Sequence, residues 1–186
     1  MNYTIRLANT HDEEAIYKLY KAVSQNVGGI ARQESEITSD YIKTNLEKSI
    51  LKGICLVIEN LGNTNELIAE IHCYKPEPKV FSHVLSDLTI VVHPNYTGKG
   101  IGHLIFSSLL NKIETDYNTI LRVELIARES NLKAIKLYQS LGFVIEGKFE
   151  KRIKNNDGSF EADIPMAWIN KNFNNMSVRT KLKTYN

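Results

Sequence analysis

Residues 91–102 form the segment that most limits what this chain can fold into. An apolar, strand-like run ends there, and Gly98, Gly100 and Gly102 then open an amphipathic helical pattern. Glycines let backbone N–H groups approach a ligand closely, and the free N–H groups at a helix start favour an anion such as phosphate. Lys99 adds a positive charge. The segment predicts a phosphate-binding turn, although a tight turn without any ligand fits the same residues.

Two common nucleotide-binding motifs do not match this turn. A P-loop requires Ser or Thr directly after its Gly-Lys pair, whereas Lys99 is followed by Gly100. A dinucleotide-binding fingerprint spaces its glycines as Gly-x-Gly-x-x-Gly in the first βαβ unit. Here the spacing differs, and the turn follows several expected strands. Both alternatives are therefore disfavoured.

Hydrophobic periodicity predicts an α/β (α+β) protein with a mixed central sheet of about seven strands, in the order βααβββαβαββ and with helices on both faces. Helices are expected after a capping box at Thr10 and Glu13, over 39–48, after Gly100 and over 131–141. Strands are expected at 3–7, 54–59, 67–74, 84–92, 120–127, 143–153 and 160–169.

Turn-forming residues predict two hairpins in this order of elements. Residues 61–65 predict the turn of a hairpin, and Asn156-Asp157-Gly158 predicts a second hairpin turn before the last strand. Because proline cannot donate to a strand ladder, Pro165 predicts an edge or a bulge in that strand.

Composition narrows the class of protein. The chain has 186 residues, of which 42% are hydrophobic, enough for one domain with a real core. We expect that domain to span residues 1–170, followed by a loosely ordered basic tail at 171–186. A net charge of +2 favours neither a nucleic-acid nor a membrane partner. Two cysteines and no signal-peptide pattern favour a reducing, cytoplasmic location.

The glycine turn resembles a known family motif. Residues 97–102, Thr-Gly-Lys-Gly-Ile-Gly, are similar to motif A of the GCN5-related N-acetyltransferase (GNAT) superfamily, Arg/Gln-x-x-Gly-x-Gly/Ala, with Thr97 at the Arg/Gln position. Residues 131–143 are similar to motif B, Asn-x-x-Ala-x-x-Leu-Tyr-x-x-x-Gly-Phe, and one expected strand separates the two motifs. Residues 142–166 look most like the RimJ/RimL and small-amine or amino-acid branch.

The resemblance implies the GNAT fold and an N-acetyltransferase that uses acetyl-CoA, without a metal. The amine of a small molecule or peptide N-terminus would attack the thioester directly. A non-catalytic CoA-binding sensor is the alternative, favoured by Thr97. By the same resemblance, the cofactor-binding residues are Val91, Val92, Thr97, Gly98, Lys99, Gly100, Ile101, Gly102 and Asn131. Val91 and Val92 would act through main-chain atoms, and Asn131 could instead be only a helix cap.

Tyr138, which matches the motif B tyrosine, is the expected acid that protonates the departing thiolate. It could equally be a core residue of its helix. The expected base is a carboxylate on a strand, with Asp87 ranked before Glu70 and Glu124 third. Each of these could instead belong to the polar face of a half-buried strand. His72 can face the substrate cleft, but the histidines have no metal-ligand spacing.

The acceptor cannot be chosen from the sequence. The expected connection between the first two helices, residues 25–37, contains Arg32, Glu34 and Glu36. Acidic residues there would favour a cationic amine, and Arg32 would favour a carboxylate. A homodimer is implied by the family resemblance alone.

Overall fold

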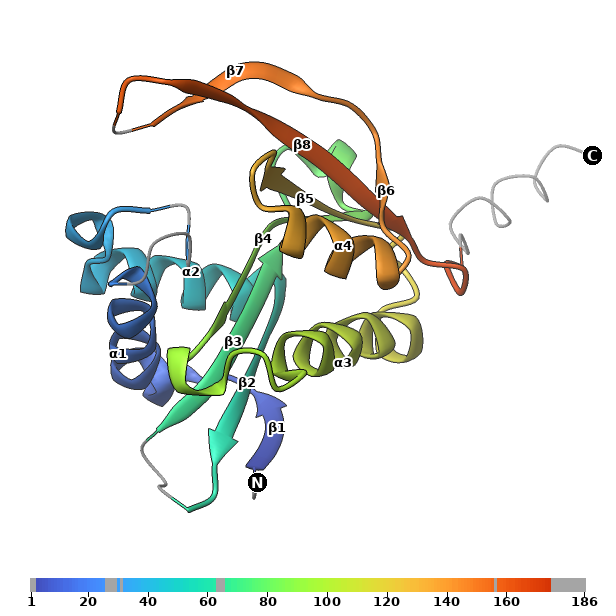
Figure 1. Cartoon of the computed structure of the whole chain (residues 1–186). Helices are drawn as coiled ribbons and strands as arrows, with labels where there is room; N and C mark the ends of the chain where they lie inside the picture. The colour runs from blue at the N-terminus through green and yellow to red at the C-terminus, as the bar shows by residue number, and fades with distance from the viewer. Residues whose placement is uncertain (1–2, 26–29, 31, 63–65, 156, 175–186) are drawn as a thin grey trace, which may run out of the picture.

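The protein is built around one mixed sheet, shown in Figure 1. The computed structural model describes residues 3–25, 30, 32–62, 66–155 and 157–174. Within these residues the strands are β1 (Tyr3–Leu7), β2 (Gly53–Asn60), β3 (Leu67–Tyr74), β4 (Val84–Val92), β5 (Arg122–Arg128), β6 (Val144–Ile145), β7 (Phe149–Lys154) and β8 (Phe160–Ile169). The α-helices are α1 (Glu13–Ser24), α2 (Ser39–Lys52), α3 (Ile101–Asp116) and α4 (Leu132–Ser140).

The strand order is β1-β2-β3-β4-β5-β8-β6, and β7 also pairs with β8. The β4–β5 pair is parallel, whereas the other pairs in the described chain are antiparallel. This is the expected mixed sheet with a parallel section where a helix connects the strands. No helix among the described residues has the length and apolar character needed to cross a membrane.

Helices cover both faces of the sheet, as predicted. Alternate strand residues point to opposite faces, and each face packs against different helices. In β2, Ile54 and Leu56 join the core cluster that contains the buried face of α3. Cys55 and Val57 join a second cluster with α1 and α2. Tyr41, which packs against this second cluster, also lines the cleft described below.

The sheet has eight strands rather than about seven, because the expected strand at 143–153 is divided into β6 and β7. The division lies opposite Pro165, whose carbonyl accepts a hydrogen bond from the N–H of Glu146. Pro165 does not mark a sheet edge, since β8 pairs with β5 on one side and with β6 and β7 on the other. It does not mark a bulge in β8 either, because β8 keeps an unbroken register with β5 through Pro165. The interruption falls on the partner strand instead.

The structure also describes part of the second hairpin turn and the start of the C-terminal tail. Asn155 and Ser159 close the second hairpin turn by a backbone hydrogen bond of 2.8 Å. Asn174 donates its N–H to the carbonyl of Asn118, so the start of the expected tail contacts the domain. The turn residues 63–65, Asn156, Gly28 and Gly29, and the rest of the tail lie outside the described residues.

The entry into α1 begins earlier than the sequence predicts. Asn9, not Thr10, caps a short 3-10 turn, and its side-chain oxygen accepts a hydrogen bond from the N–H of His11. The carboxylate of Asp12 accepts from the N–H of Asn9 at 2.8 Å, which completes the capping box. Asp12 replaces Glu13 in that role because α1 starts only after this turn.

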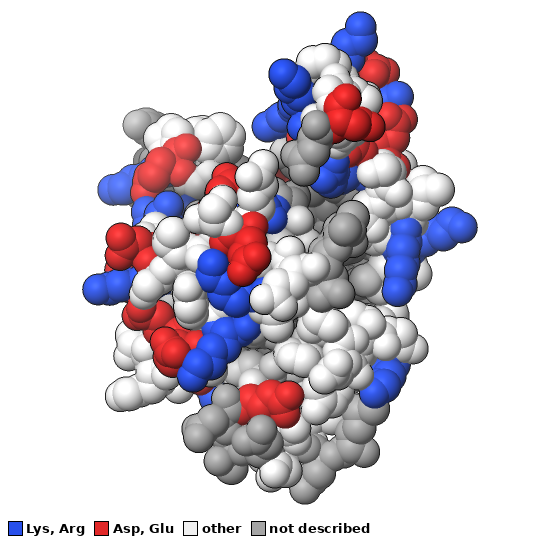
Figure 2. Space-filling view, turned by 60° about the vertical axis from the view of Figure 1, so that its left-hand side comes forward, with Lys and Arg blue, Asp and Glu red and all other residues white. Residues whose placement is uncertain are grey.

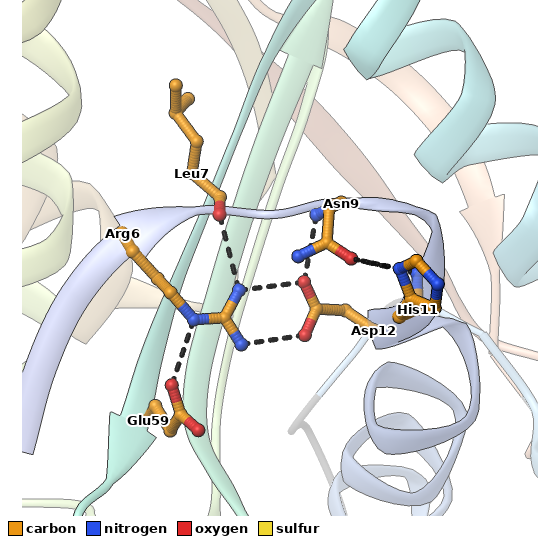
Figure 3. Close-up of polar contacts among 6 residues, drawn as sticks. All are labelled: Arg6, Leu7, Asn9, His11, Asp12 and Glu59. Carbon is orange, nitrogen blue, oxygen red and sulfur yellow. Dashed lines mark hydrogen bonds and ion pairs between the residues drawn. The ribbon is translucent and has the colours of Figure 1, made fainter.

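Arg6 connects this turn to the sheet, as Figure 3 shows. Its guanidinium donates two hydrogen bonds of 2.8 Å to the nearly buried carboxylate of Asp12 and one of 2.9 Å to Glu59. Burial alone would raise the pKa of Asp12, but the hydrogen bonds from Arg6 and Asn9 outweigh it and hold the pKa below its usual value. The ionised carboxylate therefore stabilises the fold.

We expect Asp12→Ala to lower the free energy of unfolding at neutral pH by about 1.5–3 kcal/mol, because it removes charged hydrogen bonds from a shielded site. Since the folded-state pKa is lowered, the stabilisation is present above the unfolded-state pKa and is lost as pH falls through the folded-state pKa. Urea unfolding at several pH values should show the variant and the wild type converge in acid.

Glu14→Ala is the matched control for this measurement, because Glu14 pairs with Lys18 on an exposed face of α1. It should change the free energy of unfolding by less than about 0.5 kcal/mol. Equal losses for Asp12→Ala and Glu14→Ala would contradict the role given to Asp12.

Candidate active site

A cleft of about 1010 Å³ opens where β4 and β5 separate. The two strands pair only at Val84 with Arg122 and at Leu85 with Val123. Beyond Leu85, no described strand pairs with this side of β4. The cleft is lined by both strands, by α4, by residues in and before α2, and by the β7–β8 hairpin and its approach. In Figure 2 a recess lies between the raised hairpin and the rest of the molecule.

The separation starts at a bulge in β4. His72 pairs with Thr89 and Tyr74 with Ser86, so β4 holds one more residue than β3 over this stretch. Asp87 lies in the bulge with a φ of 51°, an uncommon conformation for a residue with a side chain. The structure places Asp87 on the cleft wall, exposed, and without a hydrogen bond or ion pair to any described residue. An unpaired carboxylate at this position can attract an ammonium group.

Tyr138 reaches the cleft from the inner side of α4. Its ring packs against Phe106 and Phe143, with centroids 5.5 and 6.1 Å away. Burial raises the pKa of the hydroxyl to about 12, so the group keeps its proton at neutral pH. The hydroxyl has no hydrogen-bond partner among the described residues, which leaves it available to a group in the cleft.

Glu70 is placed differently from Asp87. Its side chain is 1% exposed and does not line the cleft. The carboxylate lies between the sheet and α1, where it accepts hydrogen bonds from Tyr20 at 2.8 Å and from the thiol of Cys55 at 3.1 Å. It is also 2.8 Å from Nδ1 of His72, and His72 does line the cleft. A direct contact between Glu70 and a substrate is therefore excluded by the packing.

The glycine turn presents free backbone donors. Gly98 and Gly100 adopt φ of 73° and 79°, which a residue with a side chain adopts only at a cost. From Gly98 to His103, the N–H groups donate to no described residue, because the first helical bond runs from Leu104 to the carbonyl of Gly100. Together with the start of α3, these N–H groups form an arrangement that suits an anion.

The side chains flanking this turn are engaged locally. The hydroxyl of Thr97 donates to the carbonyl of Pro94 at 2.9 Å, and Lys99 donates to the carbonyl of Asn95 at 2.8 Å. Neither residue lines the cleft itself, which ends short of the turn. The Lys99 ammonium also lies over the ring of Tyr96, 5.3 Å from its centroid.

The remaining expected cofactor residues are held by packing. Val91 is buried against α1 and α2, whereas Ile101 is buried in the α3 cluster. Val92 is half-buried and lies 3.8 Å from the position that a side-chain carbon on Gly102 would take. The side chains of Val91 and Ile101 are therefore taken up by the core. Asn131 both lines the cleft and caps α4, because its side-chain oxygen accepts from the N–H of Ala134 at 3.1 Å.

The sequence did not predict the ion pairs that Arg122 forms on the β5 wall of the cleft. Arg122 donates from Nε to Glu124 at 2.8 Å and from its terminal nitrogens to both carboxylate oxygens of Glu146. Glu124 is therefore held in an ion pair with a neighbour on its own strand. No sequence signal identifies Glu146 as the partner, since 24 residues separate it from Arg122.

The family comparison agrees with this geometry. A sequence model described as "Acetyltransferase (GNAT) family" matches residues 14–143, a range that includes the glycine turn, Asp87 and Tyr138. The chain belongs to the GNAT acetyltransferase family. The resemblance found in motifs A and B is thereby confirmed, and this GNAT protein is an acetyltransferase.

Solved structures share the fold. A GNAT acetyltransferase from Streptococcus pneumoniae matches with a TM-score of 0.79 at 23% identity, over 90% of this chain and 99% of that one. A putative acetyltransferase from Salmonella typhimurium, solved with acetyl-CoA, matches with a TM-score of 0.76 at 22% identity, over 91% and 94%. A ribosomal-protein-alanine N-acetyltransferase from Brucella melitensis gives 0.75 at 22%, over 89% and 99%. A search of curated proteins found no match.

The two cysteines of this GNAT acetyltransferase should be unreactive in the native protein. Burial, and after it the charge of Glu70, raise the pKa of the Cys55 and Cys73 thiols, and the thiol form is a poor nucleophile. We expect no labelling of native protein by Ellman's reagent at pH 8, and labelling of both thiols in guanidinium chloride. Rapid labelling of the native chain would contradict this expectation.

Proposed function

We propose that this protein transfers the acetyl group of acetyl-CoA to a primary amine of a small molecule or a peptide N-terminus. The observation that carries the proposal is the cleft between β4 and β5, which places an unpaired carboxylate, Asp87, and a protonated phenol, Tyr138, along one cavity. Membership of the GNAT acetyltransferase family supports the acetyl transfer. The class of amine is our inference from the cleft.

The carrier's diphosphate would bind at the glycine turn. Free N–H groups from Gly98 to His103 are hydrogen-bond donors at the start of a helix, the chemistry that a diphosphate requires. Lys99 adds charge, and Thr97 can still accept or share a hydrogen bond through its hydroxyl. The pantetheine amides would then pair with the main chain of β4 near Val91 and Val92, as an added strand does. Asn131 would lie beside that arm.

The thioester would lie between Tyr138 and the bulge. The neutral amine attacks the thioester carbonyl carbon, a C–N bond forms, and the C–S bond breaks with its electron pair on sulfur. Tyr138 gives its proton to the departing thiolate, and the proton that the newly bonded nitrogen then loses returns to Tyr138 through water. Main-chain N–H groups of the unpaired β4 edge can stabilise the developing oxyanion. Asp87 attracts the ammonium form of the acceptor into the cleft.

We expect Tyr138→Phe to lower kcat by about 10²-fold, because the leaving thiolate loses its proton donor. The KM for acetyl-CoA should change little, since the ring and its packing remain. Free CoA release with a panel of polyamines, amino acids and N-terminal peptides provides the measurement. Tyr117→Phe, which removes a hydroxyl outside the cleft at the end of α3, is the matched control and should leave kcat unchanged.

We expect Gly100→Glu to abolish measurable binding of CoA in calorimetry, because it adds negative charge beside the free N–H groups and strains a φ of 79°. Gly158→Glu is the matched control, since Gly158 has a φ of 84° at the open tip of the β7–β8 hairpin. It should bind CoA as the wild type does. CoA binding without transfer to any amine would support the sensor alternative instead.

A further inference from the structure

Three donors converge on the buried carboxylate of Glu70. Tyr20 from α1 and Cys55 from β2 donate to its two oxygens, and Nδ1 of His72 lies 2.8 Å from Oε1. Burial and the nearby charge of Glu70 raise the pKa values of Tyr20 and Cys55, so both keep their protons and remain donors. A carboxylate only accepts hydrogen bonds, so its contact with His72 requires the proton on Nδ1. Apolar side chains would fill this part of the core equally well, so the polar groups around Glu70 are not required by packing.

This contact determines what the other ring nitrogen of His72 can do. With the proton on Nδ1, Nε2 carries the lone pair and can accept a proton. Nε2 has no partner among the described residues, and no side-chain nitrogen or oxygen there is both sealed from solvent and unpartnered. His72 lines the cleft, so Nε2 is accessible from it. The ring also lies parallel to that of Tyr74, at 6.2 Å between centroids.

We propose that His72, oriented by Glu70, is the base that takes the proton from the acceptor amine. The ammonium N–H bond breaks, its proton binds to Nε2, and the electron pair left on nitrogen attacks the thioester. Glu70 stabilises the imidazolium that forms, which later loses its proton to water. This inference rests on the proposed acetyl transfer and assigns its proton step, with His72 as the catalytic residue and Glu70 as a positioning residue.

The other acids near the cleft suit this step less well. In model peptides an imidazole is a stronger base than a carboxylate by about two pKa units. Glu124 is engaged by Arg122, and Asp87 lies on the exposed bulge, where its charge attracts the ammonium. Asp87 and His72 then have separate tasks, one for binding and one for proton transfer.

Several ionisable groups surround His72 and can affect how the reaction depends on pH. They are Glu70 and Tyr74 on β3, Tyr20 on α1, Tyr41 on α2, Cys55 on β2, Asp87 on β4, Arg32 before α2, and the Arg122–Glu124 pair across the cleft on β5. Burial raises the pKa values of Tyr20, Tyr74 and Cys55, so these three groups keep their protons near neutral pH. Glu70 is the charged group in direct contact with the ring.

The test compares His72→Gln with wild type over pH 6 to 10, using an amine that wild type acetylates. We expect a kcat about 10²-fold lower at pH 7 and a nearly unchanged KM for acetyl-CoA. The deficit should shrink as pH approaches the pKa of the free amine, because the amine then arrives already deprotonated. His83→Gln is the matched control, since His83 precedes β4 and does not line the cleft. Near-ultraviolet circular dichroism checks that each variant folds.

Glu70→Gln supplies a second readout that loss of packing alone would not produce. It keeps the size of the side chain but removes the charge that stabilises the imidazolium. The acid limb of the pH–activity profile should therefore move to lower pH, with a lower kcat on the plateau.

The possible failures are distinguishable. Wild-type activity with an unchanged profile for folded His72→Gln overturns this inference alone. A constant deficit at every pH also overturns it, because it indicates a structural role. If wild type binds CoA but acetylates no amine, the proposed function fails and the proton step fails with it.

Discussion

One extra residue in β4 is the constraint on which the active-site region depends. The sheet is continuous from β1 to β3, and its register with β4 holds until the bulge at Asp87. There the strand turns away from β5 after only two paired residues. A parallel sheet normally satisfies the backbone groups of both neighbours, so this parting leaves an open edge inside the protein. The cleft and its unsatisfied main-chain groups have a single structural cause.

The ends of the cleft have different chemistry because different elements close them. Toward α4, the cleft has the capping Asn131 and the apolar surroundings of Tyr138, and the backbone donors at the start of α3 lie beyond its end. Toward α2 and the β7–β8 hairpin, the lining residues contribute charged and aromatic groups. The buried Glu70 accepts a hydrogen bond from Tyr20 of α1, which connects this helix to the sheet, and it also contacts His72. Structural and proposed catalytic roles thus meet in one polar cluster.

Neighbouring residues in the sequence were sufficient to predict a feature where that feature depends on one segment of the chain. The glycine turn is one such segment, since positive φ at Gly98 and Gly100 and the free N–H groups follow from neighbouring residues. Tyr138 is another, because helical spacing places it on the inner side of α4. Local signals failed at Pro165 and at residues 143–153, where the partner strand decides the pairing. They also failed to separate Asp87 from Glu70, since both are acids on strands of similar pattern.

By itself, the sequence determined the element order as far as α4, the turn with its backbone donors, the family and the position of the phenol, because each of these depends on residues close together in the chain. Only the tertiary structure decided which carboxylate faces solvent and which is enclosed by Tyr20, Cys55 and His72. That choice depends on strand register and on the helix packed above it. A shift of one residue in register reverses the face to which every side chain of a strand points.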